Sequence, residues 1–310
     1  MDHLLELESK IEELQNLSGQ TGLDMSEEVR SLRDKLQSET RRTFDGLNAW
    51  QRVQLSRHPL RPQTSDYIDH MVEDFVPLAG DRAFAEDYAI ICGLGRIEDI
   101  PCMIIGQQKG KDVHERRRCN FGSPHPEGYR KAMLKMRVAE KFHLPIVTLI
   151  NTPGAYPGIG AEERGQSIAI AENIRDMAAL RTPVVSVVIG EGGSGGALGI
   201  GVGDRILILE NSYYSVISPE GCAAILWKDG SKAPDAAERL RLTAQALHEL
   251  GIADEVVQEP AGGAHRQGEL MSRQLGAVVA RHLRELLAMS EAELRDARYA
   301  KYRAIGQWQE

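Results

Sequence analysis

The residues with the clearest chemical potential are the glycines of the stretch 190–203, which follow an apolar, β-branched run that begins at Pro183. The run predicts a strand that passes into the N-terminus of a helix at about residue 195. The first N–H groups of a helix have no partner within it, and glycine lets a ligand approach them closely. We therefore predict an oxyanion hole with the backbone amides of Gly195 and Gly196 as donors. The loop that carries them comprises Gly192, Gly193 and Ser194.

Three other motifs overlap in this stretch. Gly190-x-Gly192-x-x-Gly195 matches a dinucleotide-binding fingerprint, but the segment after it is too short and too glycine-rich for a βαβ crossover. A P-loop is excluded because no Gly-Lys-Ser/Thr follows the glycines. Glycines also allow close packing of a helix on a strand, so a purely structural role stays open.

The pattern Gly192-x-Ser194-x-Gly196 also matches the nucleophile elbow of a serine hydrolase. A serine nucleophile needs a base, and His248 and His265 lie downstream of it in the chain. Nothing in the sequence brings either histidine to Ser194, so the hydrolase remains a second hypothesis.

A second loop is expected beside the first. The buried strand 145–150 opens into the Gly/Pro-rich segment 151–160, and a helix over 161–180 returns the chain to the strand at 183. Because the carboxyl ends of parallel strands meet at one edge of a sheet, both loops should face a common pocket. The loop residues that we expect to bind substrate or cofactor are Pro153, Gly154, Ala155 and Tyr156.

A basic segment stands out in a chain with a net charge of −8. A solvated surface loop is one interpretation, and a contact with ligand phosphates or with an acidic partner surface is the other. The residues concerned are Lys109, Lys111, Arg116, Arg117 and Arg118. The acidic overall balance argues against a general nucleic-acid binder.

Composition limits the class of protein. With 310 residues and 42% hydrophobic residues, the chain can build one large folded domain or two modest ones. Its four cysteines show neither zinc-ligand nor disulfide spacing, so we predict no metal in this chain. No apolar run is long enough to span a membrane and no secretory signal is present, which predicts a protein of the reducing cytoplasm.

The remaining elements follow from periodicity. Residues 3–17 and 26–47 have amphipathic helical spacing with a break at 18–22, which predicts an antiparallel hairpin that either docks a partner or covers its own domain. Further elements are predicted as follows: a helix over 64–75, a hairpin of strands 88–97 and 100–106, a helix over 129–142, a strand pair 205–209 and 213–217, helices over 220–227 and 235–250, a strand over 255–258, and helices over 267–288 and 291–303.

Motifs spread over nearly the whole chain resemble the alpha subunit of the carboxyltransferase of bacterial-type, multi-subunit acetyl-CoA carboxylase. They are Ala49–Gln51, Leu55–Pro62, Ala79–Arg82, Met103–Gly110, Asn120–Gly122, Pro126–Ala132, Gly154–Gln166, Gly190–Asp204 and Ser215–Trp227. The resemblance implies an α/β, crotonase-type fold of stacked β-β-α units with an N-terminal helical hairpin. The expected organisation is a hairpin and Pro-rich turn over 1–62, a crotonase-type domain over 63–290 and a C-terminal surface helix and tail over 291–310.

The resemblance also implies an activity. Such a subunit, together with a zinc-containing beta subunit in an α₂β₂ assembly, transfers the carboxyl group of carboxybiotin to acetyl-CoA and forms malonyl-CoA for fatty-acid synthesis. The biotin is borne by the separate biotin carboxyl carrier protein, and biotin carboxylase consumes ATP elsewhere in the complex. Within this scheme the amides of Gly195 and Gly196 would stabilise the negative charge on the biotin ureido oxygen.

Two positions depart from the family pattern, because this chain has Asn151 where Asp is usual and Gln107 where His is usual. A charged role at 151 is thereby put in question, although a side-chain amide can still serve as a hydrogen-bonding group. Two other hypotheses remain, namely a serine hydrolase of the crotonase-type fold that uses Ser194 and a non-catalytic scaffold subunit.

Overall fold

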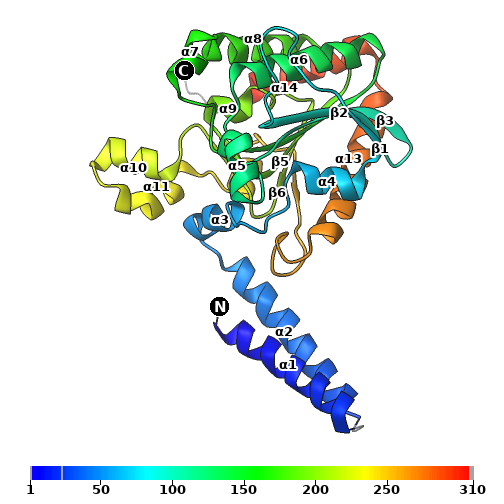
Figure 1. Ribbon diagram of the computed structural model, residues 1–310, viewed down its shortest axis with the longest axis vertical. Helices are drawn as coiled ribbons and strands as arrows, with labels where there is room; N and C mark the ends of the chain where they lie inside the picture. Colours follow the sequence, from blue (N-terminus) through cyan, green and yellow to red (C-terminus); the bar gives the residue numbers. More distant parts are fainter. Residues whose placement is uncertain (1, 22–23, 307–310) are drawn as a thin grey trace.

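A mixed sheet of eight strands forms the centre of the protein (Figure 1). The computed structural model describes residues 2–21 and 24–306. The strands are β1 (Glu73–Pro77), β2 (Ile90–Ile97), β3 (Ile100–Gln107), β4 (Ile146–Thr152), β5 (Val184–Gly193), β6 (Arg205–Leu209), β7 (Tyr213–Ser215) and β8 (Glu255–Val257).

The strand order is β1-β2-β3-β4-β5-β6-β8, with β7 paired to β5 outside this path. β1, β2 and β3 are antiparallel neighbours, and the pairs from β3 through β8 are parallel. The β2–β3 hairpin and the parallel β4–β5 pair confirm the sequence prediction, and the carboxyl ends of β4 and β5 share one edge of the sheet.

Helices cover both faces of the sheet. The helices after the N-terminal pair are α3 (Ala49–Ser56), α4 (Thr64–Met71), α5 (Val113–Arg118), α6 (Pro126–Lys141), α7 (Ile159–Glu163), α8 (Gln166–Ala179), α9 (Ser194–Leu198), α10 (Pro219–Trp227), α11 (Ala233–Leu240), α12 (Ala244–Glu249), α13 (Gly268–Leu287) and α14 (Glu291–Ala304). Of these, α10 and α11 project away from the sheet (Figure 1). In Figure 1, α6 and α8 lie above the sheet, and α4 and α13 lie below it.

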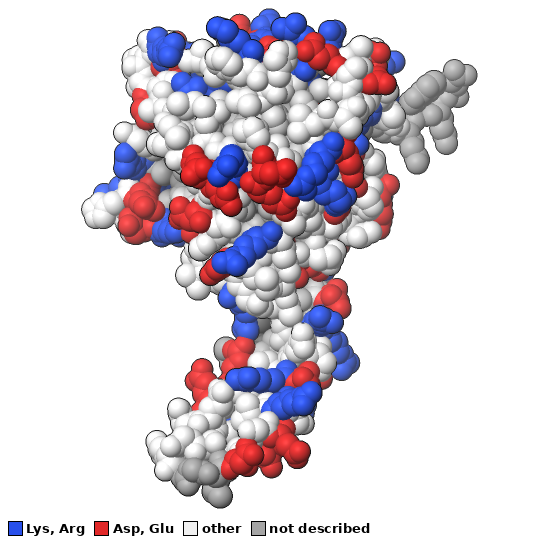
Figure 2. Space-filling model, turned by 90° about the vertical axis from the view of Figure 1, so that its right-hand side faces the viewer, with Lys and Arg blue, Asp and Glu red and all other residues white. Residues whose placement is uncertain are grey.

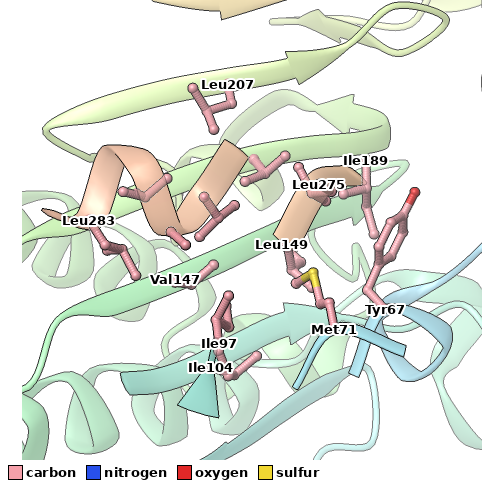
Figure 3. Close-up of a cluster of buried hydrophobic side chains, with 14 of the residues drawn as sticks. Tyr67, Met71, Ile97, Ile104, Val147, Leu149, Ile189, Leu207, Leu275 and Leu283 are labelled. Carbon is pink, nitrogen blue, oxygen red and sulfur yellow. The ribbon is translucent and has the colours of Figure 1, made fainter. Parts of the chain in front are cut away.

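Alternation along the strands divides the core between these two layers. On β5, Val185, Val187 and Ile189 join a cluster with α4 and α13 (Figure 3), and Val184 and Val188 join a second cluster with α6 and α8. Successive side chains of a strand point to opposite faces, so a strand covered on both faces is apolar throughout. This burial fixes the position of β5, whose end carries the predicted site.

The predicted elements around β5 need four corrections. The helix predicted over 64–75 ends at Met71, because 73–77 forms edge strand β1, in which Phe75 lies against Gly93. The helix predicted over 161–180 is two helices, separated at Gly165, which has a φ of 79°. The helix predicted over 235–250 is likewise two, α11 and α12.

The fourth correction concerns β6 and β7, which were predicted to pair with each other. Both pair with β5 instead, β6 along Val185–Val188 and β7 along Glu191–Gly193. The ten-residue β5 is longer than β6, so its last residues are left for a different neighbour.

Helices α1 (Asp2–Thr21) and α2 (Ser26–Asp45) form the predicted hairpin. α1 continues through 18–21, where a break was predicted; Gly22 lies outside the described residues.

The hairpin contacts the rest of the protein at the loop 260–266, through Thr40 and Phe44 of α2. Most of its length extends away from the sheet (Figure 1), with acidic and basic side chains interspersed on the face seen in Figure 2. Partner docking stays a prediction for this hairpin.

The helix predicted over 291–303 is α14, which is less of a surface helix than its composition suggests. The guanidinium of Arg298 is buried and donates to both carboxylate oxygens of Asp204 at 2.8 Å. It also donates to the carbonyl oxygens of Met177, Leu180 and Thr182. Arg298 therefore fastens the C-terminal helix to α8 and to the start of β5.

We predict that Arg298→Ala lowers the free energy of unfolding by about 3–5 kcal/mol, because it leaves Asp204 as a buried charge without its partner. Chemical denaturation monitored by circular dichroism would measure the change. Arg295→Ala on the exposed side of the same helix is the matched control, with an expected change within about 0.5 kcal/mol. Equal effects of the two substitutions would contradict the anchoring role of Arg298.

Candidate functional site

The junction of β5 and α9 departs from its predicted form. β5 continues to Gly193, so the first glycines belong to the strand and not to a turn, and α9 has only five residues. The junction itself is Ser194, which has a φ of 52°, a left-handed conformation that costs a non-glycine residue roughly 1–2 kcal/mol. A five-residue helix is too short for a dinucleotide-binding βαβ unit, which removes that alternative.

The two predicted loops lie against each other. A Cβ atom on Gly193 would be 2.3 Å from the carbonyl oxygen of Pro153, and one on Gly196 would be 2.4 Å from the amide nitrogen of Ala155. Only glycine fits such backbone contacts. Gly195 differs, because a Cβ there would meet only Ile170 at 3.8 Å. The structure thus brings Pro153, Gly154 and Ala155 to the first turn of α9.

The amide groups of this first turn are the central feature of the site. Within the described part of the chain, the N–H groups of Gly195 and Gly196 donate no hydrogen bond. The first turn of a helix offers no internal acceptor to these groups. Ser194 is exposed and Gly195 is half-buried, whereas Gly196 is buried against the loop 153–155, so a ligand can reach this turn from the side of Ser194 and Gly195.

The position of Tyr156 is set by two residues that precede the helix α6, Pro124 and His125. Its ring stacks on His125 with the ring centres 4.1 Å apart, and its N–H donates to the carbonyl oxygen of Pro124. Thr152 restrains the start of the loop, because its hydroxyl oxygen accepts the N–H of Gly154 at 3.0 Å. The loop is therefore fixed at both ends, and Tyr156 is placed by its stacking on His125.

A buried carboxylate lies immediately before the glycines. Glu191, with a side chain 6% exposed, accepts hydrogen bonds from Arg57 Nε at 2.8 Å, from Lys109 Nζ and from the Tyr213 hydroxyl at 2.6 Å. Arg57 also pairs with Glu220. Burial would raise the pKa of Glu191, but the charges of Lys109 and Arg57 and their hydrogen bonds lower it to about 2. Glu191 is therefore ionised at neutral pH.

This charged cluster borders a cleft that reaches the loop at Pro153. One part, of about 510 Å³, is lined by Arg57, Lys109, Phe121, Pro153, Glu191, Ser218 and Glu220. An adjoining part, of about 230 Å³, shares Arg57, Lys109 and Phe121 with the first and extends to Arg61, Arg116 and Asn151. Phe121 is 60% exposed and has a φ of 54°, so a strained turn holds an aromatic ring at the mouth of the cleft.

The basic segment is divided by the structure. Lys109 and Arg116 line the cleft. Lys111 instead pairs with Asp66, and Arg118 lies over the ring of Tyr88 at 3.6 Å. Arg117 is exposed on α5, a helix where a loop was predicted. A phosphate or partner contact therefore remains a prediction that concerns Lys109 and Arg116 first.

Three residues of the site were missed at the level of sequence: Arg57, Glu191 and Tyr213. Arg57 lies in the motif 55–62, which was noted only for its likeness to a family. A glutamate at the end of an apolar, β-branched run was a usable signal, because a carboxylate in a buried strand requires a cationic partner. Nothing in the sequence pointed to Tyr213, because the strand that carries it was paired wrongly.

The serine hydrolase hypothesis lacks its base. His248 contacts the carbonyl oxygen of Ala253, and the ring of His265 lies 4.3 Å from that of His58. Among the residues that the structure describes, no histidine is hydrogen-bonded to Ser194. The described residues also contain no cluster of metal-binding side chains and no helix long and apolar enough to cross a membrane.

Comparison with known proteins gives close full-length relatives. Residues 2–306 match the model of the family described as acetyl co-enzyme A carboxylase carboxyltransferase-like. The acetyl-coenzyme A carboxylase carboxyl transferase subunit alpha of Xanthomonas campestris pv. campestris (strain B100) is 56% identical over 99% of this chain and 96% of its own length. The protein of the same name from Geobacter metallireducens is 53% identical with the same coverage.

Solved structures agree on the fold. The beta subunit of geranyl-CoA carboxylase from P. aeruginosa superposes with a TM-score of 0.57 at 18% identity, over 82% of this chain and 46% of its own. Transcarboxylase 12S superposes with a TM-score of 0.55 at 18% identity, over 70% of this chain and 42% of its own. These neighbours confirm the predicted α/β, crotonase-type fold.

The contact between α9 and the loop 153–155 predicts opposite results for two neighbouring glycines. Gly196→Ala should cost about 1–3 kcal/mol of stability, because its Cβ overlaps backbone atoms of the loop. Gly195→Ala has room and should be neutral or stabilising by up to about 1 kcal/mol, since alanine favours helix. Thermal unfolding of both variants measures the difference, and equal stabilities would show that the loop does not touch α9.

The low pKa of Glu191 predicts a pH dependence of stability. The pKa falls from 4.5 to about 2 on folding, and (4.5 − 2) × 1.36 gives about 3 kcal/mol of stabilisation. A lowered folded pKa stabilises fully above pH 4.5, and the effect is lost as the pH falls toward 2. The stability difference between wild type and Glu191→Gln should therefore be constant from pH 7 to 5.5 and shrink below 4.5, in denaturation series at each pH.

Glu220→Gln is the control for Glu191→Gln. Glu220 also pairs with Arg57, but its side chain is 43% exposed. Solvent screens such a pair, so the substitution should cost less than about 1 kcal/mol at any of these pH values. A pH-independent difference for Glu191→Gln would show that the carboxylate is not held ionised by Lys109 and Arg57.

Proposed function

This chain belongs to the family of acetyl-CoA carboxylase carboxyltransferase alpha subunits, it carries out carboxyl transfer as part of that enzyme, and we propose that the first turn of α9 is its catalytic element. The amides of Gly195 and Gly196 would donate to the ureido oxygen of biotin. Gly192, Gly193, Ser194 and the loop Pro153–Tyr156 would bound the pocket around this ring.

One observation carries the proposal, namely that the N–H groups of Gly195 and Gly196 have no acceptor within the described residues, at the end of β5 where Ser194 is exposed and Gly195 is half-buried. Two preorganised donors of this kind stabilise an oxyanion without reorganisation, and loss of one such donor costs about 10²–10³ in rate in other enzymes. The carboxyl ends of parallel strands are where α/β proteins bind ligands.

The residues of this chain do not need to supply an acid or a base. Carboxybiotin, borne by a separate carrier protein, supplies the carboxyl group and a nitrogen that can take a proton from the methyl group of acetyl-CoA. The amides of α9 would favour transfer because they bind the ureido oxygen more strongly as negative charge grows on it. No side-chain base contacts Ser194 within the described residues, which fits this division of roles.

An alpha subunit implies a beta subunit as partner. We further propose that the partner contains zinc, binds acetyl-CoA and malonyl-CoA and stabilises the enolate of the thioester, in an α₂β₂ assembly of the cytoplasm. The other proposed partners are the biotin carboxyl carrier protein and biotin carboxylase, the latter being where ATP is used. None of these proposals requires a metal or ATP site in this chain.

Coexpression with the beta subunit of the same organism tests the activity. The purified complex should form malonyl-CoA from acetyl-CoA and carboxylated carrier protein, and each subunit alone should be inactive. A chain that binds the beta subunit without supporting carboxyl transfer would be a scaffold. Labelling of Ser194 by a fluorophosphonate would instead support the serine hydrolase.

The donor itself is tested by replacing the amide of residue 195 with an ester, through incorporation of glycolic acid at that position. This change replaces one N–H by an ester oxygen and leaves the side chains unaltered, so we expect kcat to fall by about 10²–10³ with little change in KM for acetyl-CoA. The same ester at Gly230, an exposed residue outside the site, is the control. An unchanged kcat for the ester at 195 would contradict its role as a donor.

A further inference from the structure

Gln107 lies at the end of β3, beneath the first turn of α9, and is fully buried. Its side-chain nitrogen donates to the carbonyl oxygen of Gly196 at 2.8 Å. Its side-chain oxygen accepts the N–H of Asn151 at 3.0 Å. A carbonyl can only accept and an N–H can only donate, so both ends of the amide are fixed in one orientation.

This side chain joins the two halves of the site. Asn151 is the penultimate residue of β4, next to the loop 153–155, and Gly196 is in α9. Asn151 in turn accepts the N–H of Glu191 through its side-chain oxygen at 3.2 Å. A continuous chain of buried hydrogen bonds therefore runs from α9 through Gln107 and Asn151 to the charged cluster at the end of β5.

The helix has few other restraints. The Tyr129 hydroxyl also donates to the carbonyl oxygen of Gly196, at 3.1 Å, and Asn173 donates to the carbonyl oxygen of Gly199 at 2.9 Å. α9 is too short to be held straight by its own hydrogen bonds, and it begins at a strained residue, Ser194. Together with the packing of Gly196 on the loop 153–155, the side chains that bond these carbonyl groups therefore fix the orientation of the whole first turn and of its amides.

We propose that Gln107 is a positioning residue for carboxyl transfer, which sets the direction of the Gly195 and Gly196 amides by holding the Gly196 carbonyl and the end of β4 at once. This inference rests on the proposed function of α9. It adds a residue that does not touch substrate but is needed for the donors to be aligned. Small errors in such alignment cost up to about 10² in rate.

The first test is Gln107→Leu, which keeps the approximate volume and removes both hydrogen bonds. In the complex with the beta subunit we expect kcat for malonyl-CoA formation to fall by about 10- to 100-fold, with KM for acetyl-CoA within about two-fold of wild type. The readout is steady-state kinetics with the carboxylated carrier protein and acetyl-CoA varied separately.

Gln108→Leu is the matched control. Gln108 is the next residue, is also buried, and uses its amide to bond Ser65 at the start of α4, away from α9. Its loss should leave kcat within about two-fold of wild type. An equal fall of kcat in both variants would assign the effect to general damage at the end of β3 and overturn the proposal.

The second test, Gln107→His, distinguishes positioning from packing. Neutral imidazole has one donor and one acceptor nitrogen, so it can replace both bonds of the amide, whereas imidazolium has two donors and cannot accept the N–H of Asn151. The ratio of kcat between this variant and wild type should be within about three-fold of one above pH 7.5. It should fall as the pH drops through the pKa of the introduced imidazole, which burial lowers from its usual value and which NMR titration of the variant measures.

The titratable groups around position 107 do not produce a pH dependence of this kcat ratio. On α6, burial raises the pKa of Tyr129 well above its usual value, and on β5 the pKa of Glu191 is about 2. Thr64 of α4, which donates to the Gln107 carbonyl oxygen, does not titrate. Lys109 and Arg57, which face Glu191, are the same in both proteins, so the ratio cancels any effect of their titration.

The outcomes separate this inference from the function on which it rests. A wild-type complex that forms no malonyl-CoA would refute the function. An active wild type together with Gln107→Leu at near-normal kcat, or with a ratio for Gln107→His that does not follow the imidazole pKa measured in that variant, would refute the role of Gln107 alone. Should Gln107→Leu fail to fold, the pH dependence of Gln107→His still decides.

Discussion

The close approach of two backbone segments is the constraint on which the rest of the site depends. α9 contacts the loop 153–155 without room for a side chain at Gly193 or Gly196. Backbone atoms can come this close only when Cβ atoms are absent, which is why glycines gather at the end of β5. The contact places the first-turn amides of α9 at the edge of the sheet, and it makes the site a property of main-chain geometry.

Such a geometry needs support from side chains that themselves do no chemistry. Glu191 is buried next to the glycines, and its negative charge would destabilise both the fold and a developing oxyanion unless it were neutralised. Arg57 and Lys109 supply two positive charges at hydrogen-bonding distance, and the Tyr213 hydroxyl adds a third bond. The cluster therefore fixes the end of β5 and keeps the cleft at Glu191 from being net negative.

Sequence patterns predicted the elements whose burial is regular along the chain. The β2–β3 hairpin, the apolar strands β4 and β5 and the long helix α13 all show their period directly. The elements that were wrong depend on partners distant in the chain: β7 pairs with the unused end of β5, and Arg298 is buried only because Asp204 lies nearby. In the site, glycine spacing located the close approach of α9 to the loop 153–155, whereas Arg57 and Tyr213 were identified only through their contacts with Glu191.

The bonds between α9, β3 and β4 need matching donors and acceptors and no charge. Gln107 donates to the Gly196 carbonyl oxygen and accepts the N–H of Asn151, while the Asn151 side chain accepts the N–H of Glu191. An uncharged amide at 151 meets the N–H of Glu191 as well as a carboxylate would, without adding another buried charge beside that glutamate. Gln107 and Asn151 thus complete these buried hydrogen bonds without a titratable side chain.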